Sequence, residues 1–467
     1  MHVIPFVIIC IYMGLLYLIS WYCTKLTKGG AEGYLLAGRG FPAGVVAVML
    51  AGLAVGGAST VGVAENAFQA GISAGWYNGA WAAGGIVVGL VAAARYRKWT
   101  ISTVPELFER YYSTGGRVLG VIAQLTILIV ITSMQYLAGG AILAALLPQY
   151  FTFQSGMVVS ALVFVGITLI GGMWAAGLTN VLNVIVIYIG VGLGAITSVL
   201  HFGGFQKITA ALPATGQWFH PFSGVGLAII AAWFVVMITQ TFSAQGPVQI
   251  AFAAKDSRAA RNGFLLGGLI IFPVGFLAAL FGIVGAAVFP DINPTMALPQ
   301  VVLTLNPVLA GLTLAGLWAA DVSTACGLLL GCSNLVVGDI LKRYLTPNLN
   351  AKQEVLISRL VTLIISVITF ILALSVAGIL QTLVVGLTLT TAFTVVLLFT
   401  MFLPKICKKS CAFWTLLAGI VQLAVWQFVP ATHIVPHPIY LAWPVCIAAF
   451  LITAALDKNP ATIDDAV

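Results

Sequence analysis

The residues best suited to chemistry in this chain are one carboxylate and two hydroxyls in the apolar stretch 319–326. Asp321 is followed within one helical turn by Ser323 and Thr324. Carboxylate and hydroxyl oxygens are hard ligands, which suit Na⁺ better than a soft metal. Asp321 could instead carry a proton, because burial favours the neutral carboxyl. Hydroxyls that bond back to their own helix would explain Ser323 and Thr324, but would leave Asp321 without a partner.

Two apolar segments are interrupted by small residues, and the interruptions are the second chemical signal. The first lies at 54–60 (AVGGAST) and the second at 243–247 (SAQGP). A break in a membrane helix frees backbone groups, which can then coordinate an ion or a solute. The glycines could equally serve close helix packing. Both readings stay open at this point.

Polar side chains near these breaks are candidates for binding a solute. No Lys or Arg is expected deep in a helix, so a carboxylate on the solute would have to meet helix N-termini, amides or a co-transported cation. Trp76 could instead be an interfacial anchor. The predicted solute-binding residues are Ser59, Gln135, Trp76, Asn78, Gln240, Ser243 and Gln245.

The elements that must position these residues are membrane-spanning helices. Of 467 residues, 61% are hydrophobic and only 7% are charged, too few to cover a soluble protein of this length. Continuous apolar runs of about 20 residues span a bilayer as helices, whereas a transmembrane barrel would show alternation. The thirteen predicted spans are 4–23, 41–69, 74–96, 116–147, 155–171, 178–201, 225–251, 264–289, 302–338, 356–375, 378–403, 409–428 and 438–456.

The distribution of basic residues predicts the orientation of these spans. With the N-terminus outside and the C-terminus inside, nineteen of the twenty Lys and Arg residues fall on the inner side, and only Lys207 falls outside. The net charge of +8 is therefore a topology signal and not a sign of nucleic-acid binding. The pattern predicts a multi-pass protein of the inner (cytoplasmic) membrane.

We expect a single transmembrane domain over 1–467. Each broken segment opens a set of five helices, and because five is odd the two sets enter the membrane in opposite directions. The predicted parts are an extra N-terminal helix and loop (1–40), a first inverted repeat (41–201), a second inverted repeat (225–403), two extra C-terminal helices (409–456) and a cytoplasmic tail (457–467).

Enzymatic signals are missing from the sequence. We find no nucleophile with a base, no phosphate-binding loop and no cluster of metal-ligating residues, and Cys407 and Cys411 have no second pair with which to hold a metal. The sequence therefore predicts no enzyme, no cofactor and no metal other than Na⁺.

In its motifs the chain resembles the sodium:solute symporter family, from about residue 4 to residue 430. The landmarks are 32–39 (EGYLLAGR), 103–111 (TVPELFERY), Gln249 with 253–256 (AAKD), and Ser323-Thr324 with Asp339-Ile340. The resemblance implies an all-α, leucine-transporter-like core of five plus five helices. It also implies one Na⁺ held by the carbonyls of Gly52, Val55 and Ala320 and the hydroxyls of Ser323 and Thr324.

Two departures from the family pattern affect the expected site. Asn180 stands where many members have Asp, and Asp321 stands where the family usually has an apolar residue, so we hypothesise that the carboxylate near the ion has moved to residue 321. Ile250 replaces a frequent Arg, which weakens any transfer of substrate identity.

The sequence thus predicts import of a small organic solute by symport with Na⁺ through alternating access. The alternatives are proton coupling through Asp321 and a sensor that binds solute without transport; a channel fits least. The expected partners are the solute, Na⁺ and the bilayer, with no nucleic acid and no obligate protein partner. A strongly anionic solute is disfavoured, whereas a zwitterion, a neutral polar solute and a monocarboxylate stay open.

Overall fold

The structure is a computed structural model that describes residues 3–26, 30–99, 101–146, 148–214, 216–346, 348–375 and 384–463, and this part of the chain is helical, with no strand. The predicted all-α class is therefore confirmed for the described residues. The helices are α1 (Val3–Cys23), α2 (Gly30–Leu36), α3 (Ala43–Ala54), α4 (Val63–Ala70), α5 (Trp76–Val91), α6 (Ala93–Lys98), α7 (Val104–Tyr111), α8 (Thr114–Leu146), α9 (Phe153–His201), α10 (Gly204–Ala211), α11 (Leu227–Ser243), α12 (Gln245–Ala253), α13 (Ser257–Val288), α14 (Ala297–Leu303), α15 (Pro307–Asn334), η5 (Leu335–Leu345), α16 (Ala351–Ala373), α18 (Thr390–Phe402), α19 (Cys411–Phe428) and α20 (Ile439–Leu456).

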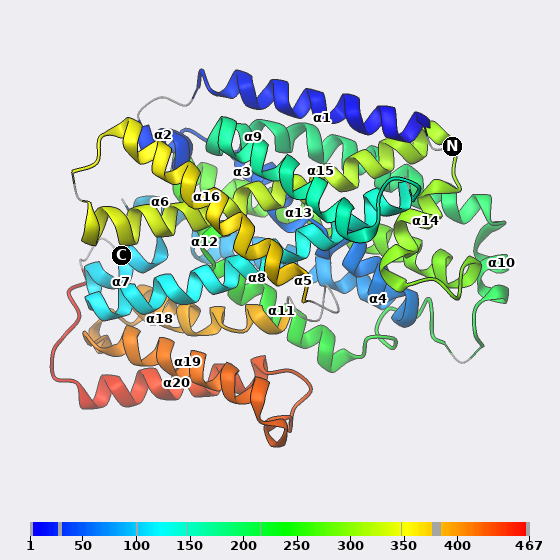
Figure 1. Ribbon diagram of the computed structural model, residues 1–467. Helices are drawn as coiled ribbons and strands as arrows, with labels where there is room; N and C mark the ends of the chain where they lie inside the picture. Colours follow the sequence, from blue (N-terminus) through cyan, green and yellow to red (C-terminus); the bar gives the residue numbers. More distant parts are fainter. Residues whose placement is uncertain are drawn as a thin grey trace.

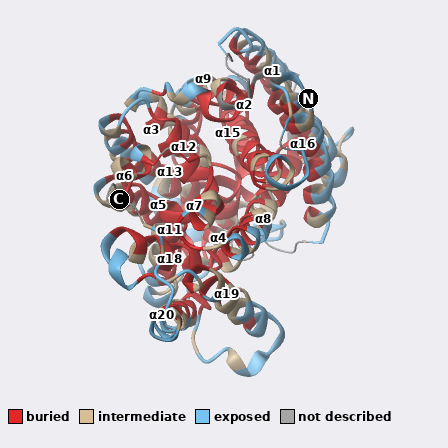
Figure 2. Ribbon diagram, turned by 90° about the vertical axis from the view of Figure 1, so that its left-hand side faces the viewer, coloured by how far each residue is buried: buried red, intermediate tan, exposed pale blue. Residues whose placement is uncertain are grey.

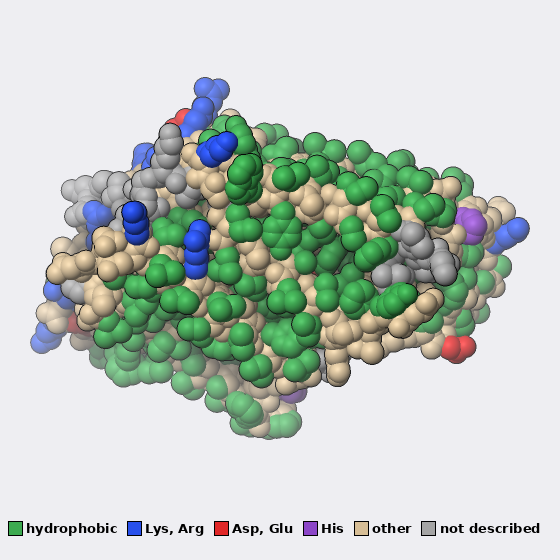
Figure 3. Space-filling view, turned by 45° about the horizontal axis from the view of Figure 1, so that its top comes forward, with side chains coloured by type: hydrophobic (Ala, Val, Ile, Leu, Met, Phe, Trp, Pro, Cys, Tyr) green, Lys and Arg blue, Asp and Glu red, His purple; other side chains and the backbone are tan. Residues whose placement is uncertain are grey.

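The helices form a bundle whose outer surface suits a bilayer. Ten described helices are long and apolar enough to cross a membrane, or up to twelve if each of two bent pairs counts as one span. A broad apolar surface occupies the middle of the molecule, and Lys and Arg gather at one end (Figure 3). We call this end, where α6 and α7 lie, the basic end (Figure 1). The predicted segment 378–403 is described from residue 384 onward, as the span Val384–Phe402.

Both predicted helix breaks are present. α3 ends at Ala54 and the chain resumes as a π-helical turn, Ala58–Gly62, that leads into α4, with a bend of 59°. α11 and α12 are bent by 47° around Ala244, whose backbone is extended. Pro247 lies in the first turn of α12, where the missing N–H has no intrahelical partner to lose. The small-residue interruptions are therefore true breaks in the helices.

One predicted boundary is wrong in detail. The sequence suggested a connection over 172–177 between two spans, but helix continues on both sides of a single residue, Gly172, with φ 61° and ψ −153°. A side chain there would crowd Tyr34, since an added Cβ would lie 2.8 Å from the Tyr34 carbonyl oxygen. One glycine in a backbone conformation that side chains disfavour thus turns the chain without a loop.

The broken helices lie inside the bundle and other helices shield them from lipid. In the most apolar window of α15, 72% of residues are buried, against 22% in α20 and 33% in α1. Buried residues fill the centre around α3, α12, α13 and α15, while exposed residues mark α1, α19 and α20 (Figure 2). The start of α1 and the end of α20 lie at opposite ends of the molecule (Figure 1).

Close packing of α9 on α15 positions the helix that carries Asp321. The hydroxyl of Thr313 donates to the carbonyl of Gly190 at 2.7 Å. A Cβ added at Gly190 would lie 2.8 Å from the Leu312 carbonyl oxygen and from Thr313 Cα, both of which are backbone atoms that cannot rotate away. Glycine is therefore needed for this contact.

We expect Gly190→Ala to lower the melting temperature of the purified protein, because overpacking a helix contact costs about 1–3 kcal/mol. Gly192→Ala, two residues away in the same helix with nothing within 4 Å of its added Cβ, is the matched control and should be neutral or slightly stabilising. Equal melting temperatures for the two variants would contradict the packing argument.

Candidate functional site

A cluster of oxygen atoms lies between α3 and α15 just before the break in α3. Thr324 Oγ1 donates to the Gly52 carbonyl at 2.6 Å, and Ser323 Oγ lies 3.2 Å from the same oxygen. Both hydroxyls also reach the Ala320 carbonyl, at 3.1 and 2.8 Å. Val55 leaves α3 in a non-helical conformation (φ −92°, ψ 72°), which turns its carbonyl away from the helix direction. The structure thus brings together four of the five residues expected at the ion.

Asn180 supports this cluster from α9. A Cβ added at Gly52 would lie 2.7 Å from Asn180 Oδ1, so the amide rests directly on the helix that offers the Gly52 carbonyl. Asn183 Nδ2 donates to Asn180 Oδ1 at 3.3 Å and to the Ala319 carbonyl at 3.2 Å. Two amides, neither of them charged, therefore hold α9 against both helices of the cluster.

Asp321 lies on the far side of the break from Gly52. The N–H of Gly57 donates to Asp321 Oδ1 at 3.1 Å and to Gln135 Oε1 at 2.9 Å. The second carboxylate oxygen, Oδ2, is buried with no hydrogen-bond donor among the described residues. The Gly57 N–H, in the break after α3, thus donates to one acceptor from α15 and to one from α8.

The predicted solute-binding residues separate into different parts of the molecule. Ser59 donates to the Ala54 carbonyl within the break, and Gln135 lies beside it through the Gly57 contact. Trp76 instead stacks on Phe222 with ring centroids 5.6 Å apart. Asn78 packs on α13, where a Cβ added at Gly275 would lie 2.7 Å from Asn78 Cβ. Only Ser59 and Gln135 are therefore grouped with the break in α3.

The three candidates around the second break have different surroundings. Gln240 of α11 is buried and its Nε2 has no partner among the described residues. Ser243 donates to the Thr390 carbonyl at 2.9 Å, which ties α11 to α18. Gln245 points to the basic end, where its Oε1 accepts from Val104 N at 3.1 Å and its Nε2 donates to the Ser102 carbonyl at 3.2 Å. These three residues therefore lie in two places: Gln240 and Ser243 are in α11, and Gln245 is at the basic end.

Polar groups that the sequence reasoning missed lie along α11 and the span Val384–Phe402. Thr239, Thr388 and Thr391 are buried, and their hydroxyls have no partner among the described residues. A cavity of about 520 Å³ at the end opposite the basic end is lined by Trp233 and Val384 of the same two elements, among other residues. The signal available in the sequence was the group of threonines at 388, 390 and 391 in an apolar segment.

Comparison with known families decides which family of proteins this architecture represents. The model of the sodium:solute symporter family matches residues 34–419. The chain belongs to this family. It is a Na⁺-coupled symporter that works by alternating access.

Curated relatives and solved structures agree with this assignment. The symporter is 25% identical over 392 residues to the osmoregulated proline transporter OpuE of Bacillus subtilis (78% of this chain, 76% of OpuE). It is 25% identical over 379 residues to the high-affinity proline transporter PutP of the same organism (76% of this chain, 78% of PutP).

The solved structures share the fold of the symporter. A Na⁺-coupled sialic acid symporter in a substrate-bound outward-open state aligns over 99% of both chains with a TM-score of 0.80 and 18% identity. MhsT in complex with L-phenylalanine aligns over 87% of this chain and 97% of MhsT, with a TM-score of 0.57 and 14% identity. These are leucine-transporter-type folds, so the predicted fold type is confirmed.

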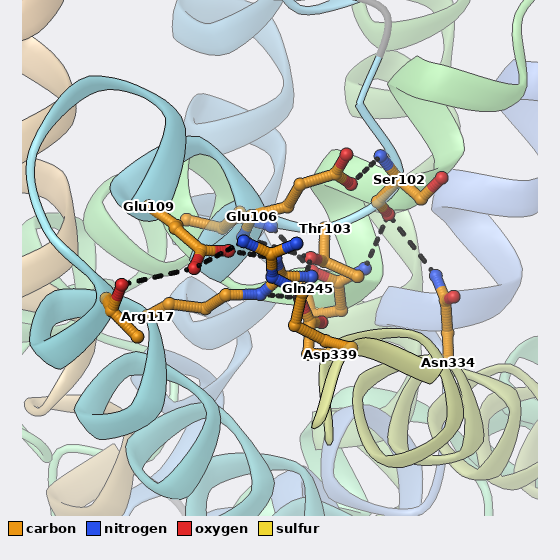
Figure 4. Close-up of polar contacts among 11 residues, drawn as sticks. Ser102, Thr103, Glu106, Glu109, Arg117, Gln245, Asn334 and Asp339 are labelled. Carbon is orange, nitrogen blue, oxygen red and sulfur yellow. Dashed lines mark hydrogen bonds and ion pairs between the residues drawn. The ribbon is translucent and has the colours of Figure 1, made fainter. Parts of the chain in front are cut away.

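At the basic end of the symporter, a network of charged and polar groups joins α7, α8 and η5 (Figure 4). Arg117 Nε donates to Asp339 Oδ1 at 2.8 Å, and its Nη1 forms an ion pair with Glu109. Thr103 Oγ1 donates to the same Asp339 oxygen at 3.0 Å. Asn334 Nδ2 donates to the Ser102 carbonyl at 3.2 Å. The network therefore holds the end of α15 and η5 against the start of α8 and the residues just before α7.

The charges in this network control the ionisation of Glu109. Burial favours its neutral form, but hydrogen bonds and charges from Arg117 and Arg343 outweigh burial and hold the pKa of the Glu109 carboxyl below its usual value. The ion pair is therefore formed at neutral pH. The neighbouring cavity of about 440 Å³ is lined by residues of both signs, including Arg117, Asp339 and Lys342.

We expect Arg117→Gln to lower the free energy of unfolding by about 3–5 kcal/mol, because it leaves the buried Asp339 carboxylate without its ion-pair partner. Arg343→Gln is the control, since that side chain is 54% exposed and its pair with Glu109 contributes at most about 1 kcal/mol. Thermal unfolding measures both, and the double change Arg117→Gln with Asp339→Asn should recover part of the loss. An Arg117→Gln variant as stable as the parent would refute the role of the ion pair between Arg117 and Asp339.

Proposed function

We propose that this symporter imports a small organic solute together with one Na⁺ bound between α3 and α15. The ligands are the carbonyls of Gly52, Val55 and Ala320 and the hydroxyls of Ser323 and Thr324. One observation carries the proposal: two hydroxyls of α15 converge on the Gly52 carbonyl, immediately before a helix break. Rotating both hydroxyl protons away would leave the oxygens of Gly52, Ala320, Ser323 and Thr324 free to bind an ion.

Coupling follows from the position of these ligands on two different helices. An ion that needs oxygens from both α3 and α15 binds tightly only when the two helices lie together as they do here. It therefore favours the conformations that keep this contact, and by linkage any solute that favours the same conformations binds more tightly in Na⁺. Release on the side where Na⁺ is scarce then drives import.

For the solute, we propose a site between the break in α3 and the facing sides of α11 and α18. Gln240 and Thr391 are buried polar groups without partners, and a buried polar group without a partner costs free energy unless a ligand or water satisfies it. Gln240 follows Trp233, which lines the 520 Å³ cavity, by about two helical turns. The cavity is then the entrance, and Ser59 of the π-helical turn Ala58–Gly62 and Gln135 of α8 border the site.

The orientation and the repeat boundaries are part of the same proposal. We take the basic end as cytoplasmic, which agrees with the positive-inside rule and puts the start of α1 outside and the end of α20 inside the inner membrane. A reversal of the chain at Gly71, which has φ 66°, would separate α4 from α5 and bring the number of crossings to thirteen. The inverted repeats are then 41–201 and 225–403, within one domain.

We expect Thr324→Ala to weaken Na⁺ binding by about tenfold or more, because the loss of a ligand from a charged group costs about 1.5–3 kcal/mol. The assay is the rise in melting temperature on replacing K⁺ by Na⁺. Thr126→Ala is the matched control, since its hydroxyl is exposed and bonds only to its own helix. An unchanged Na⁺ response in Thr324→Ala would exclude this site.

Transport itself is tested with the protein reconstituted in liposomes and a radiolabelled panel of small solutes that begins with L-proline, the solute of the curated relatives. Uptake that follows the Na⁺ gradient supports the proposal. Uptake that follows the pH gradient alone would favour proton coupling through Asp321. Solute binding without uptake under either gradient would favour a sensor.

A further inference from the structure

The carboxylate of Asp321 is an unexplained charge in the middle of the bundle. Asp321 is fully buried, and no described Lys or Arg forms an ion pair with it. Oδ1 accepts one hydrogen bond, from Gly57 N, and Oδ2 accepts none. Charged side chains at such depth are expensive and are normally paired or functional. An ionised Asp321 would therefore need a positively charged partner, which the described part of the chain does not supply.

Neither Lys nor Arg lies among the described groups that contact Asp321, and none of these groups donates a hydrogen bond to Oδ2. Gln135 directs its Oε1, an acceptor, at the same Gly57 amide, while its Nε2 is used by the Ile131 carbonyl at 3.0 Å. Ser160 Oγ, on the side of Oδ2, accepts from Trp318 Nε1 at 3.0 Å. Oδ2 of Asp321 thus remains a charged acceptor without a hydrogen-bond partner.

Two glycines pack closely against the carboxylate of Asp321. A Cβ added at Gly139 would lie 3.1 Å from Asp321 Oδ2, and one added at Gly57 would lie 2.8 Å from Oδ1. Any other residue at these positions would press against the carboxylate.

We propose that Asp321 binds a positively charged nitrogen on the transported solute, so that the substrates of this symporter are amine-bearing solutes such as zwitterions. The inference rests on the proposed function, because it assumes that the solute reaches the break in α3. It assigns to Asp321 a role distinct from that of the Na⁺ ligands.

A second Na⁺ fits the same observations less well. The point on which Asp321 Oδ1 and Gln135 Oε1 converge is already occupied by the Gly57 N–H, so a cation of either kind would have to bind at Oδ2. Oδ2 and Ser160 Oγ alone are too few oxygens for a dehydrated cation, which takes about six. An ammonium group can instead be bound by one charged acceptor together with a neutral oxygen.

The first test uses the unmodified protein and pairs of small molecules that differ in one group. α-Amino acids are compared with the matching α-hydroxy acids, alanine with lactate for example, and with neutral sugars, by thermal shift in Na⁺ and in K⁺. We expect Na⁺-dependent stabilisation by at least one amino acid and none by its hydroxy counterpart. Stabilisation by a hydroxy acid or a sugar, or none by any amine in a protein that still responds to Na⁺, would overturn the inference.

The second test substitutes Asp321→Asn, with the exposed Asp291→Asn as the control. We expect Asp321→Asn to lower the affinity for the amino acid that stabilised the parent by about thirtyfold or more. Removing one partner of a buried charge pair has an effect of this size. The stabilisation by Na⁺ alone should persist, and Asp291→Asn should match the parent.

Three outcomes of the second test would overturn the inference. The first is unchanged amino-acid affinity in Asp321→Asn. The second is a fall in the number of Na⁺ ions that bind, which would assign a second ion to Asp321. The third is an unfolded Asp321→Asn variant together with equal binding of amino and hydroxy acids by the parent. Loss of every Na⁺ response in the parent would instead contradict the proposed function, so the two failures are distinguishable.

Discussion

The break in α3 is the constraint on which the rest of the structure depends. A bilayer core offers no water to a freed backbone group, so each N–H and C=O that leaves the helix must find a partner in the protein. Here Thr324 and Ser323 cover the Gly52 carbonyl, and Gln135 and Asp321 accept from Gly57. The same groups that make the break tolerable are those that can exchange a protein partner for an ion or a solute.

Because the partners of the break come from α8 and α15, these two helices must be held with little freedom. Asn180 and Asn183 brace α9 against the cluster, and the Gly190 contact lets α9 approach α15 at backbone distance. Neutral amides and glycines do this without introducing charge next to the proposed Na⁺ site. The peripheral helices α1, α19 and α20 leave much of their surface to lipid and add no group to the cluster.

The two ends of the molecule differ in a way that fits alternating access. At the basic end, Arg117, Glu109 and Asp339 tie α7, α8 and η5 together, and Gln245 joins them from the second broken helix. At the opposite end, a cavity of about 520 Å³ lies along α11 and the span Val384–Phe402. A cavity of about 440 Å³ also lies beside the network at the basic end, so the two ends differ in their ion pairs and not in the presence of a cavity.

The sequence by itself determined the features that depend on local composition, namely the apolar spans and both helix breaks, whereas the pairing of Ser323 and Thr324 with Gly52 was implied only by the resemblance to the family. The spans and the breaks follow from short-range rules, because hydrophobic length, glycine and proline act on their own segment. Tertiary structure decided which polar residues share a space. It placed Gln245 at the basic end, Asn78 on α13 and Trp76 on Phe222, and it revealed Thr388 and Thr391 without partners. It also put Asp321 on Gly57 and away from Gly52, since the direction in which a buried side chain points depends on helix rotation and on neighbours from distant parts of the chain.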